Sequence, residues 1–199
     1  MKKSWLSLLI VFLAGCGHVL YADGPYHGKV IDKQTKQPIE GAAVVAVWMK
    51  ESPFIGHYMV RYYDAQETVT DQEGNFTIPG IVGGSANPLA KIREPSFTIF
   101  KPGYVAYRNL AFKPISVSGN IEVFEKDSLV VFALGRLTTR EERMRNLIGL
   151  NPAPRCGPQD DPASSLCLPD GKYPNLIRLK NVEERDLGLE PTQRQKGVK

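Results

Sequence analysis

The sequence is poor in the residues and motifs from which most enzyme sites are built. The 199-residue chain has three histidines, His18, His27 and His57, and none of them begins a His-x-x-Glu pattern. It also lacks the Gly-x-Ser-x-Gly elbow, the phosphate loop and the dinucleotide fingerprint, which hold reactive groups at fixed spacings. We therefore expect no catalytic residues, no metal ligands and no cofactor.

A basic stripe of the kind that binds nucleic acid is also missing. The chain has 25 Lys and Arg against 21 Asp and Glu, which gives a formal net charge of +4. Lys2 and Lys3 stand at the N-terminus, and the other charges are mixed along the chain. Binding to phosphates requires basic residues clustered on one surface, so we expect no nucleic-acid partner.

No hydrophobic run reaches the roughly 20 residues with which a helix spans a bilayer. The N-terminal run extends from Trp5 to Ala14 and is interrupted only by Ser7. It follows Lys2 and Lys3 and ends in small residues, which is typical of a secretory signal peptide. The run therefore indicates export and not a permanent helical anchor.

Residues 13–16 read Leu-Ala-Gly-Cys and resemble the bacterial lipobox. The resemblance implies that residues 1–15 are a lipoprotein signal peptide and that Cys16 carries diacylglycerol on its sulfur and a fatty acid such as palmitate on its amine. Several acyl chains would hold the protein stably at a membrane. Two alternatives stay open, namely ordinary cleavage after Ala22 and a Cys16 that is only a buried thiol. Gly17 resembles an outer-membrane sorting residue, so in a Gram-negative cell we expect an outer-membrane anchor facing the periplasm.

The other two cysteines make an even pair. Cys156 and Cys167 lie in a segment rich in Pro, Gly, Ser and Asp. In the oxidising compartment that export implies, they are expected to form a disulfide, worth about 3 kcal/mol in the chain-entropy description. Half of a metal site is the alternative, but the C-terminal region has no histidine to complete a zinc site.

Short strand-like segments separated by turn signals dominate from residue 26 to residue 135. Gly74 closes a polar stretch and is free to take the positive φ that a hairpin turn requires. Strands do not alternate with helices, so the pattern favours a β-sandwich over a parallel α/β sheet. We interpret residues 16–25 as a tether and residues 83–88 as a flexible loop. The expected strands are 26–31, 42–49, 58–63, 66–70, 75–78, 96–100, 105–112, 121–124 and 128–134.

Residues 136–199 form a C-terminal extension with one clear helix signal. Thr139 and Glu142 have the spacing of a capping box, in which each side chain bonds to an otherwise unpaired backbone N–H. Gly149 and Pro152 end that helix. A second apolar segment, expected to dock on the body, contains Leu176, Ile177, Leu179 and Val182.

Three sequence blocks share the pattern of one known family. They are residues 28–44, 70–78 and 97–104, and the last ends in Lys-Pro-Gly-Tyr. These blocks resemble the carboxypeptidase regulatory-like domain. The resemblance implies a mainly β fold, a transthyretin-like or Ig-like β-sandwich of seven strands, which we assign to residues 26–135. It carries little information on activity, and the zinc-peptidase domain that often accompanies this module is absent from the chain.

The chain departs from that family pattern between residues 48 and 67. This insertion is rich in aromatic residues, which combine a large contact area with a polar group. It is a candidate binding face for a carbohydrate or a peptide; the alternative is that alternate residues pack against the edge of the sandwich. The candidate face consists of Trp48, His57, Tyr58, Tyr62 and Tyr63.

Together these features predict a lipid-anchored, non-enzymatic protein of the cell envelope. Its β-sandwich would serve as a binding or assembly module, with the membrane and an unidentified envelope protein or glycan as partners. A carbohydrate- or peptide-binding accessory lipoprotein that uses residues 48–67 is the alternative. A small hydrolase of transthyretin-like fold is the third and least favoured hypothesis, because the chain supplies no matching set of histidine and arginine residues.

Overall fold

The computed structural model describes residues 19–85, 87–113, 119–150 and 170–191. Within these ranges the chain is mainly β, with three sheets, two α-helices and one short 3-10 helix, η1 (Asp170–Lys172). None of the helices in this part of the chain is both long and apolar enough to cross a membrane. The predicted lipidation site Cys16 and the predicted disulfide between Cys156 and Cys167 lie outside the described residues.

Two sheets form the body of the molecule. In the first, β11 (Leu129–Leu134) and β2 (Tyr26–Asp32) run parallel and the other neighbours run antiparallel. All pairings in the second sheet are antiparallel. The first sheet has the order β10 (Ile121–Lys126), β11 (Leu129–Leu134), β2 (Tyr26–Asp32), β5 (Asn75–Ile78). The second has the order β4 (His57–Val69), β3 (Ala43–Phe54), β8 (Ser96–Phe100), β9 (Tyr107–Ala111), with β7 (Lys91–Ile92) beside β3.

The two sheets pack face to face as a β-sandwich around one apolar core. Side chains alternate between the faces of a strand, so Val44, Ala46 and Trp48 of β3 point into this core. The first half of β3, residues 43–48, is buried on both faces, which explains its continuous apolar sequence. The core also contains Val30, Phe76, Ile78, Phe97, Ile99, Tyr107, Ile121, Val123, Phe132 and Leu134.

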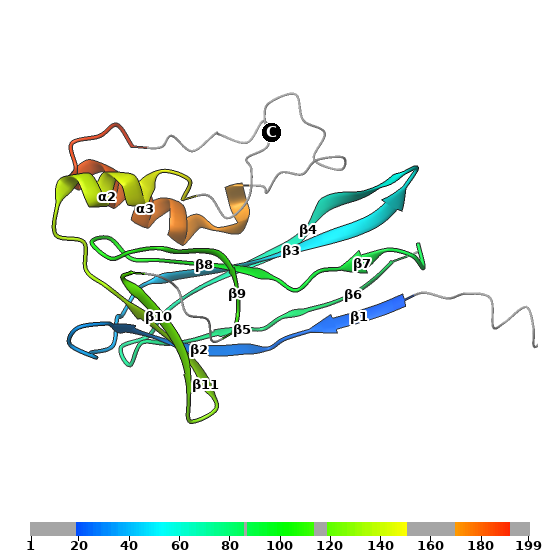
Figure 1. Ribbon diagram of the computed structural model, residues 1–199, viewed down its shortest axis with the longest axis horizontal. Helices are drawn as coiled ribbons and strands as arrows, with labels where there is room; N and C mark the ends of the chain where they lie inside the picture. Colours follow the sequence, from blue (N-terminus) through cyan, green and yellow to red (C-terminus); the bar gives the residue numbers. More distant parts are fainter. Residues whose placement is uncertain (1–18, 86, 114–118, 151–169, 192–199) are drawn as a thin grey trace, which may run out of the picture.

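A layer of helices covers the opposite face of the second sheet. Helices α2 (Arg140–Leu147) and α3 (Pro174–Asp186) lie on one side of the sandwich (Figure 1). They bury Ala43, Val45 and Val47 of β3 in a second apolar cluster. The predicted capping box of Thr139 and Glu142 is present at the start of α2. The predicted docking segment is a full helix, α3, whose Leu176, Ile177 and Leu179 belong to this second cluster.

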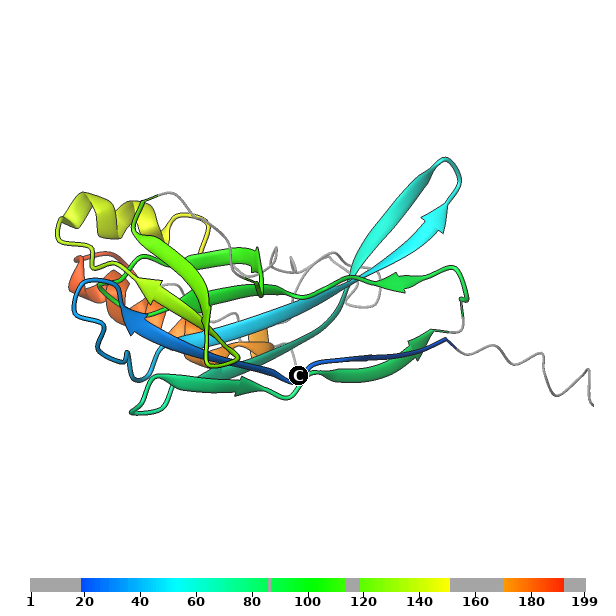
Figure 2. The same ribbon diagram turned by 60° about the horizontal axis from the view of Figure 1, so that its bottom comes forward.

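Both sheets continue beyond the sandwich as two arms. Strands β1 (Val19–Asp23) and β6 (Ile81–Ser85) pair antiparallel in a two-stranded ribbon, which extends the β2–β5 edge of the first sheet. The distal half of the β3–β4 hairpin, flanked by β7, extends the second sheet. Figures 1 and 2 show that the ribbon, β7 and the hairpin tip reach toward the same end of the molecule.

The ribbon corrects two predictions from the sequence. Residues 19–23 lie within the expected tether but form β1, and residues 83–85 lie within the expected loop but form part of β6. The physical reason is pairing, because each of these segments satisfies the backbone hydrogen bonds of the other. Likewise, the expected strands 58–63 and 66–70 are one continuous strand, β4, because it pairs with β3 along its whole length.

Candidate functional site

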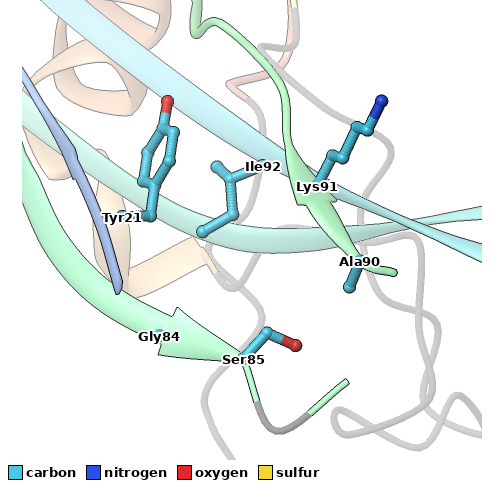
Figure 3. Close-up of a pocket in the computed structure, with 6 residues that line it drawn as sticks. All are labelled: Tyr21, Gly84, Ser85, Ala90, Lys91 and Ile92. Atoms are coloured by element: carbon cyan, nitrogen blue, oxygen red, sulfur yellow. The ribbon is translucent and has the colours of Figure 1, made fainter. Parts of the chain in front are cut away.

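A cavity of about 240 Å³ lies between the two arms. The ribbon provides one wall and β7, with the residue before it, provides the other (Figure 3). Figure 3 shows the side chains of Tyr21 and Ile92 close together, while the Lys91 ammonium extends away from them. The lining residues are Tyr21, Gly84, Ser85, Ala90, Lys91 and Ile92.

Three of the lining residues supply polar groups. Burial, followed by the negative charge of Asp23, raises the pKa of Tyr21 to about 12, so its hydroxyl stays protonated at neutral pH. The hydroxyl of the buried Ser85 accepts a hydrogen bond from the backbone N–H of Asn87 at 3.2 Å. Lys91 is exposed. The cavity thus offers hydroxyl groups and an ammonium group beside the apolar side chains of Ala90 and Ile92.

Asp23 links the ribbon to the sandwich beneath the cavity. Its carboxylate accepts hydrogen bonds from the Tyr26 hydroxyl at 2.6 Å and from Trp48 Nε1 at 2.6 Å. Burial, and then the hydrogen bond to Asp23, hold the pKa of Tyr26 far above its ordinary value. Tyr26 also contacts Phe97 edge-to-face, with ring centroids 5.1 Å apart. These contacts fix the direction in which the ribbon leaves the core.

Tyr63 supports the ribbon from the β4 side. It packs against the sandwich core, and its hydroxyl lies directly under Gly83 of β6. A Cβ atom at position 83 would overlap the Tyr63 hydroxyl. Glycine fits this point of the strand, because the Tyr63 hydroxyl fills the space that a side chain at position 83 would need.

The structure separates the five residues of the predicted aromatic face. Trp48 is completely buried in the core. Tyr62 and Tyr63 are neighbours in β4 and point to opposite faces, since Tyr62 packs against the helical-layer cluster. His57 and Tyr58 lie exposed near the hairpin tip. The five side chains therefore do not form one surface: Trp48 and Tyr63 pack in the sandwich core, and Tyr62 packs on the opposite face of the sheet, under the helices.

Sequence reasoning missed the residues that do line the cavity. Tyr21 lay in the segment interpreted as a tether, and Ser85 in the segment interpreted as a loop. The pairing of β1 with β6 brings them together, and they are 64 positions apart in sequence. No local pattern marks this pair, because residues 20–22 are consecutive and apolar without alternation and residues 81–85 contain two glycines. No group of three or more His, Cys, Asp or Glu side chains within the described ranges is placed to hold a metal ion.

The fold and cavity define the chain as a β-sandwich protein with a helical layer and two arms. No known protein-family model matches the sequence, and no curated protein matches it. Among solved structures, the chain is similar to the pilus adhesin RrgA from Streptococcus pneumoniae, with 12% sequence identity and a TM-score of 0.34. The match covers 58% of this chain and 15% of the adhesin chain. At this TM-score, the similarity does not establish a shared fold.

Proposed function

We propose that this chain is a lipid-anchored, non-enzymatic protein of the cell envelope that uses its β-sandwich as a binding or assembly module. The proposal starts from residues 13–16, Leu-Ala-Gly-Cys, with Cys16 as the acylated residue and the outer membrane of a Gram-negative cell as the location. The sandwich would be of the transthyretin-like, carboxypeptidase regulatory-like type. Strand β2 and the β3 and β5 segments that carry the family blocks all belong to the sandwich, which supports this assignment.

One structural observation favours lipoprotein cleavage over ordinary signal cleavage. Cleavage after Ala22 would remove all of β1 except Asp23. It would also leave β6 without its only ladder partner among the described strands and would remove Tyr21 from the cavity. Cleavage before Cys16 keeps β1 and the ribbon intact. The mature chain is therefore proposed to begin at Cys16.

Substitution of Cys16 tests the anchor. We expect the wild-type protein to fractionate with envelope membranes and to require detergent for extraction. Cys16→Ala removes the sulfur that would carry diacylglycerol, so this variant should not be processed at Cys16 or labelled by a radioactive fatty acid. Gly17→Ala is the matched control, because it alters the neighbouring position without removing the thiol. Equal fatty-acid labelling of the Cys16→Ala variant and the control would contradict the proposal.

A disulfide between Cys156 and Cys167 belongs to the same proposal. In the sequence, the two cysteines fall in the segment that connects α2 and α3, and both helices pack on the second sheet. Export would place them in an oxidising compartment. Thiol labelling of the folded, unreduced protein should find neither cysteine reactive, whereas labelling of both after denaturation without a reductant would rule the disulfide out.

A second candidate function is the binding of a small carbohydrate or peptide in the cavity between the arms. Its support is the combination of Tyr21, Ser85 and Lys91 with apolar walls, which is typical of small-ligand sites. Glycan and peptide arrays probed with the wild-type protein and with Tyr21→Ala test it. Tyr58→Ala is the matched control, since Tyr58 is exposed and does not line the cavity. Array binding that is the same for Tyr21→Ala and the wild-type protein would exclude the cavity as the binding site.

A further inference from the structure

We propose that the end of the two arms is a membrane-contacting surface that lies on anionic phospholipid. This arm-end surface combines exposed apolar side chains with basic side chains. The proposal rests on the acylation of Cys16 proposed above, and it adds the orientation in which the protein meets the membrane. The surface consists of Leu20, Phe54, Ile55, Tyr58 and Leu89, with Lys50, Arg61 and Lys91.

Large apolar side chains are unusually exposed at this end. Leu20 is 83% exposed, Ile55 90%, Leu89 68%, Tyr58 67% and Phe54 55%. They come from three separate segments, namely β1, the β3–β4 hairpin tip and the connection from β6 to β7. Grouped exposed apolar residues mark a surface that meets another phase or partner, whereas scattered single ones carry no such meaning. Tyrosine is also enriched where proteins meet the membrane–water interface.

These segments reach the same end of the long axis. Figure 1 shows the start of β1, the loop before β7 and the hairpin tip at one end, with the helices toward the other. Figure 2, rotated about that axis, also shows them toward this end, with the hairpin tip turned away from the ribbon. Strand pairing agrees, because Lys91 of β7 lies opposite Glu51, three residues before Phe54 at the end of β3.

The position of Cys16 identifies the partner as a membrane. Only Gly17 and His18 separate Cys16 from Val19, the first residue of β1. Three Cα-to-Cα steps span at most about 11 Å. An acylated Cys16 therefore holds the start of β1 within about that distance of the lipid headgroups, at the end of the molecule toward which the hairpin tip also reaches.

The charges at the arm end complement an anionic surface. Lys50 lies directly opposite Arg61 in the β3–β4 ladder, and like charges in this position destabilise a sheet unless an anion is near. Lys50, Arg61 and Lys91 make no ion pair with the part of the chain that the structure describes. Of the nearby carboxylates, Glu51 is paired with Arg93 at 3.0 Å and also lies opposite Lys91, and Glu94 is exposed close to Tyr21. Anionic headgroups would attract the three free cations.

Brominated lipids, which quench tryptophan fluorescence at short range, provide the test. Mature protein that begins at Cys16 contains one tryptophan, Trp48, which is fully buried and serves as an internal reference. The acylated protein is inserted into vesicles of phosphatidylcholine and phosphatidylglycerol, in which the phosphatidylcholine is brominated. Phe54→Trp reports on the hairpin tip. Ile148→Trp is the matched control, because Ile148 is also 72% exposed but follows α2 in the helical layer.

We expect brominated lipid to remove about half of the emission that the Phe54→Trp substitution adds, since interfacial apolar residues reach the boundary of the acyl chains. The emission added by Ile148→Trp should be unchanged. Replacement of Arg61 and Lys91 by glutamine should weaken the quenching in vesicles with phosphatidylglycerol. Equal quenching of the two tryptophan variants would overturn the proposal. Sedimentation that depends on protein concentration, without quenching of Phe54→Trp, would also overturn it, because the arm end would then pack against a second copy of the chain.

The mass of the same preparation separates the two proposals. A chain that carries the acyl mass but shows no quenching of Phe54→Trp would overturn the membrane-contacting surface and leave the lipid anchor intact. A chain without acyl mass would contradict the anchor. If that chain still bound the anionic vesicles with quenching at position 54, the arm-end surface would stand without the anchor.

Discussion

At the scale of single residues, the buried Asp32 carboxylate accepts four hydrogen bonds. Asp32 is buried at the end of β2, and its carboxylate accepts hydrogen bonds from the backbone N–H groups of Gln34 and Thr35, both at 2.9 Å. Arg136 Nε and the Tyr104 hydroxyl donate to its other oxygen, at 2.6 and 3.2 Å. Burial opposes ionisation, but these bonds together outweigh it and hold the pKa of Asp32 well below its usual range.

This carboxylate should make the fold sensitive to acid. Because its pKa is lowered in the folded protein, ionised Asp32 stabilises the fold above the unfolded-state value of about 3.9, and this stability is lost as the pH falls through the lower folded value. Asp32→Asn should lower the free energy of unfolding at pH 7 by about 2–4 kcal/mol. Urea unfolding from pH 7 down to about pH 2 measures both effects.

Glu122→Gln is the control for Asp32→Asn. Glu122 pairs with Lys33 at 3.3 Å, but its side chain is half exposed. Exposed ion pairs contribute about 0–1 kcal/mol, so this change should alter stability little. A cost for Asp32→Asn no larger than that of Glu122→Gln would show that the Asp32 network does not stabilise the fold.

At the scale of elements, a buried ion pair joins the two helices. Arg143 of α2 donates to both carboxylate oxygens of Glu183 of α3, at 2.8 and 2.6 Å. The Glu183 side chain has no exposed surface, and the backbone N–H of Gly103 also donates to it at 3.3 Å. The pair therefore fixes α3 against both α2 and the sheet.

Removal of one partner should loosen the helical layer. Glu183→Ala leaves the Arg143 guanidinium partly buried without its main partner, which should cost about 3 kcal/mol. Asp186→Asn is the control, because Asp186 lies 3.7 Å from the same guanidinium but is mostly exposed. We expect faster hydrogen exchange in α3 of Glu183→Ala alone. Similar exchange in both variants would mean that apolar packing suffices to dock α3.

The ribbon depends on the contact between Gly83 and Tyr63. Gly83→Ala should strain the ribbon by about 1–3 kcal/mol, because the added methyl group meets the Tyr63 hydroxyl. Tyr63→Phe removes that hydroxyl, so Gly83→Ala should cost less in a Tyr63→Phe background. A double-mutant cycle measured by urea unfolding gives the coupling. Equal costs of Gly83→Ala in the two backgrounds would contradict the contact.

The elements differ in how well the sequence predicts them. Elements set by neighbouring residues were predicted, whereas elements set by contacts between residues far apart in sequence were not. The strand 96–100 and the capping box at Thr139 were predicted correctly, because alternation, β-branched residues and cap spacing are local signals. Strand β6 was missed, because Gly83 is set by its contact with the distant Tyr63 and not by its neighbours in sequence. Trp48 was predicted on a binding face but lies in the core, where its indole N–H is bonded to Asp23 across 25 positions.

At the scale of the whole molecule, the two ends are proposed to have different environments: the arm end faces the membrane, and the helical layer faces the aqueous side. Strand β1 of one arm begins three residues after Cys16, whereas α2 and α3 cover the sandwich face away from the first sheet (Figures 1 and 2). With the arm end on the membrane, the sandwich and its helical layer remain free to meet an envelope partner. The cavity at Tyr21 and Lys91 would then open close to the headgroups.

The central claim is that the mature protein begins at an acylated Cys16. Intact-mass analysis of the wild-type protein extracted from its native envelope with detergent tests it most directly. The account predicts a chain of residues 16–199 that carries the added mass of diacylglycerol and an amine-linked fatty acid, with Cys156 and Cys167 oxidised. A chain that begins at Asp23, or one that begins elsewhere with an unmodified Cys16, would contradict it.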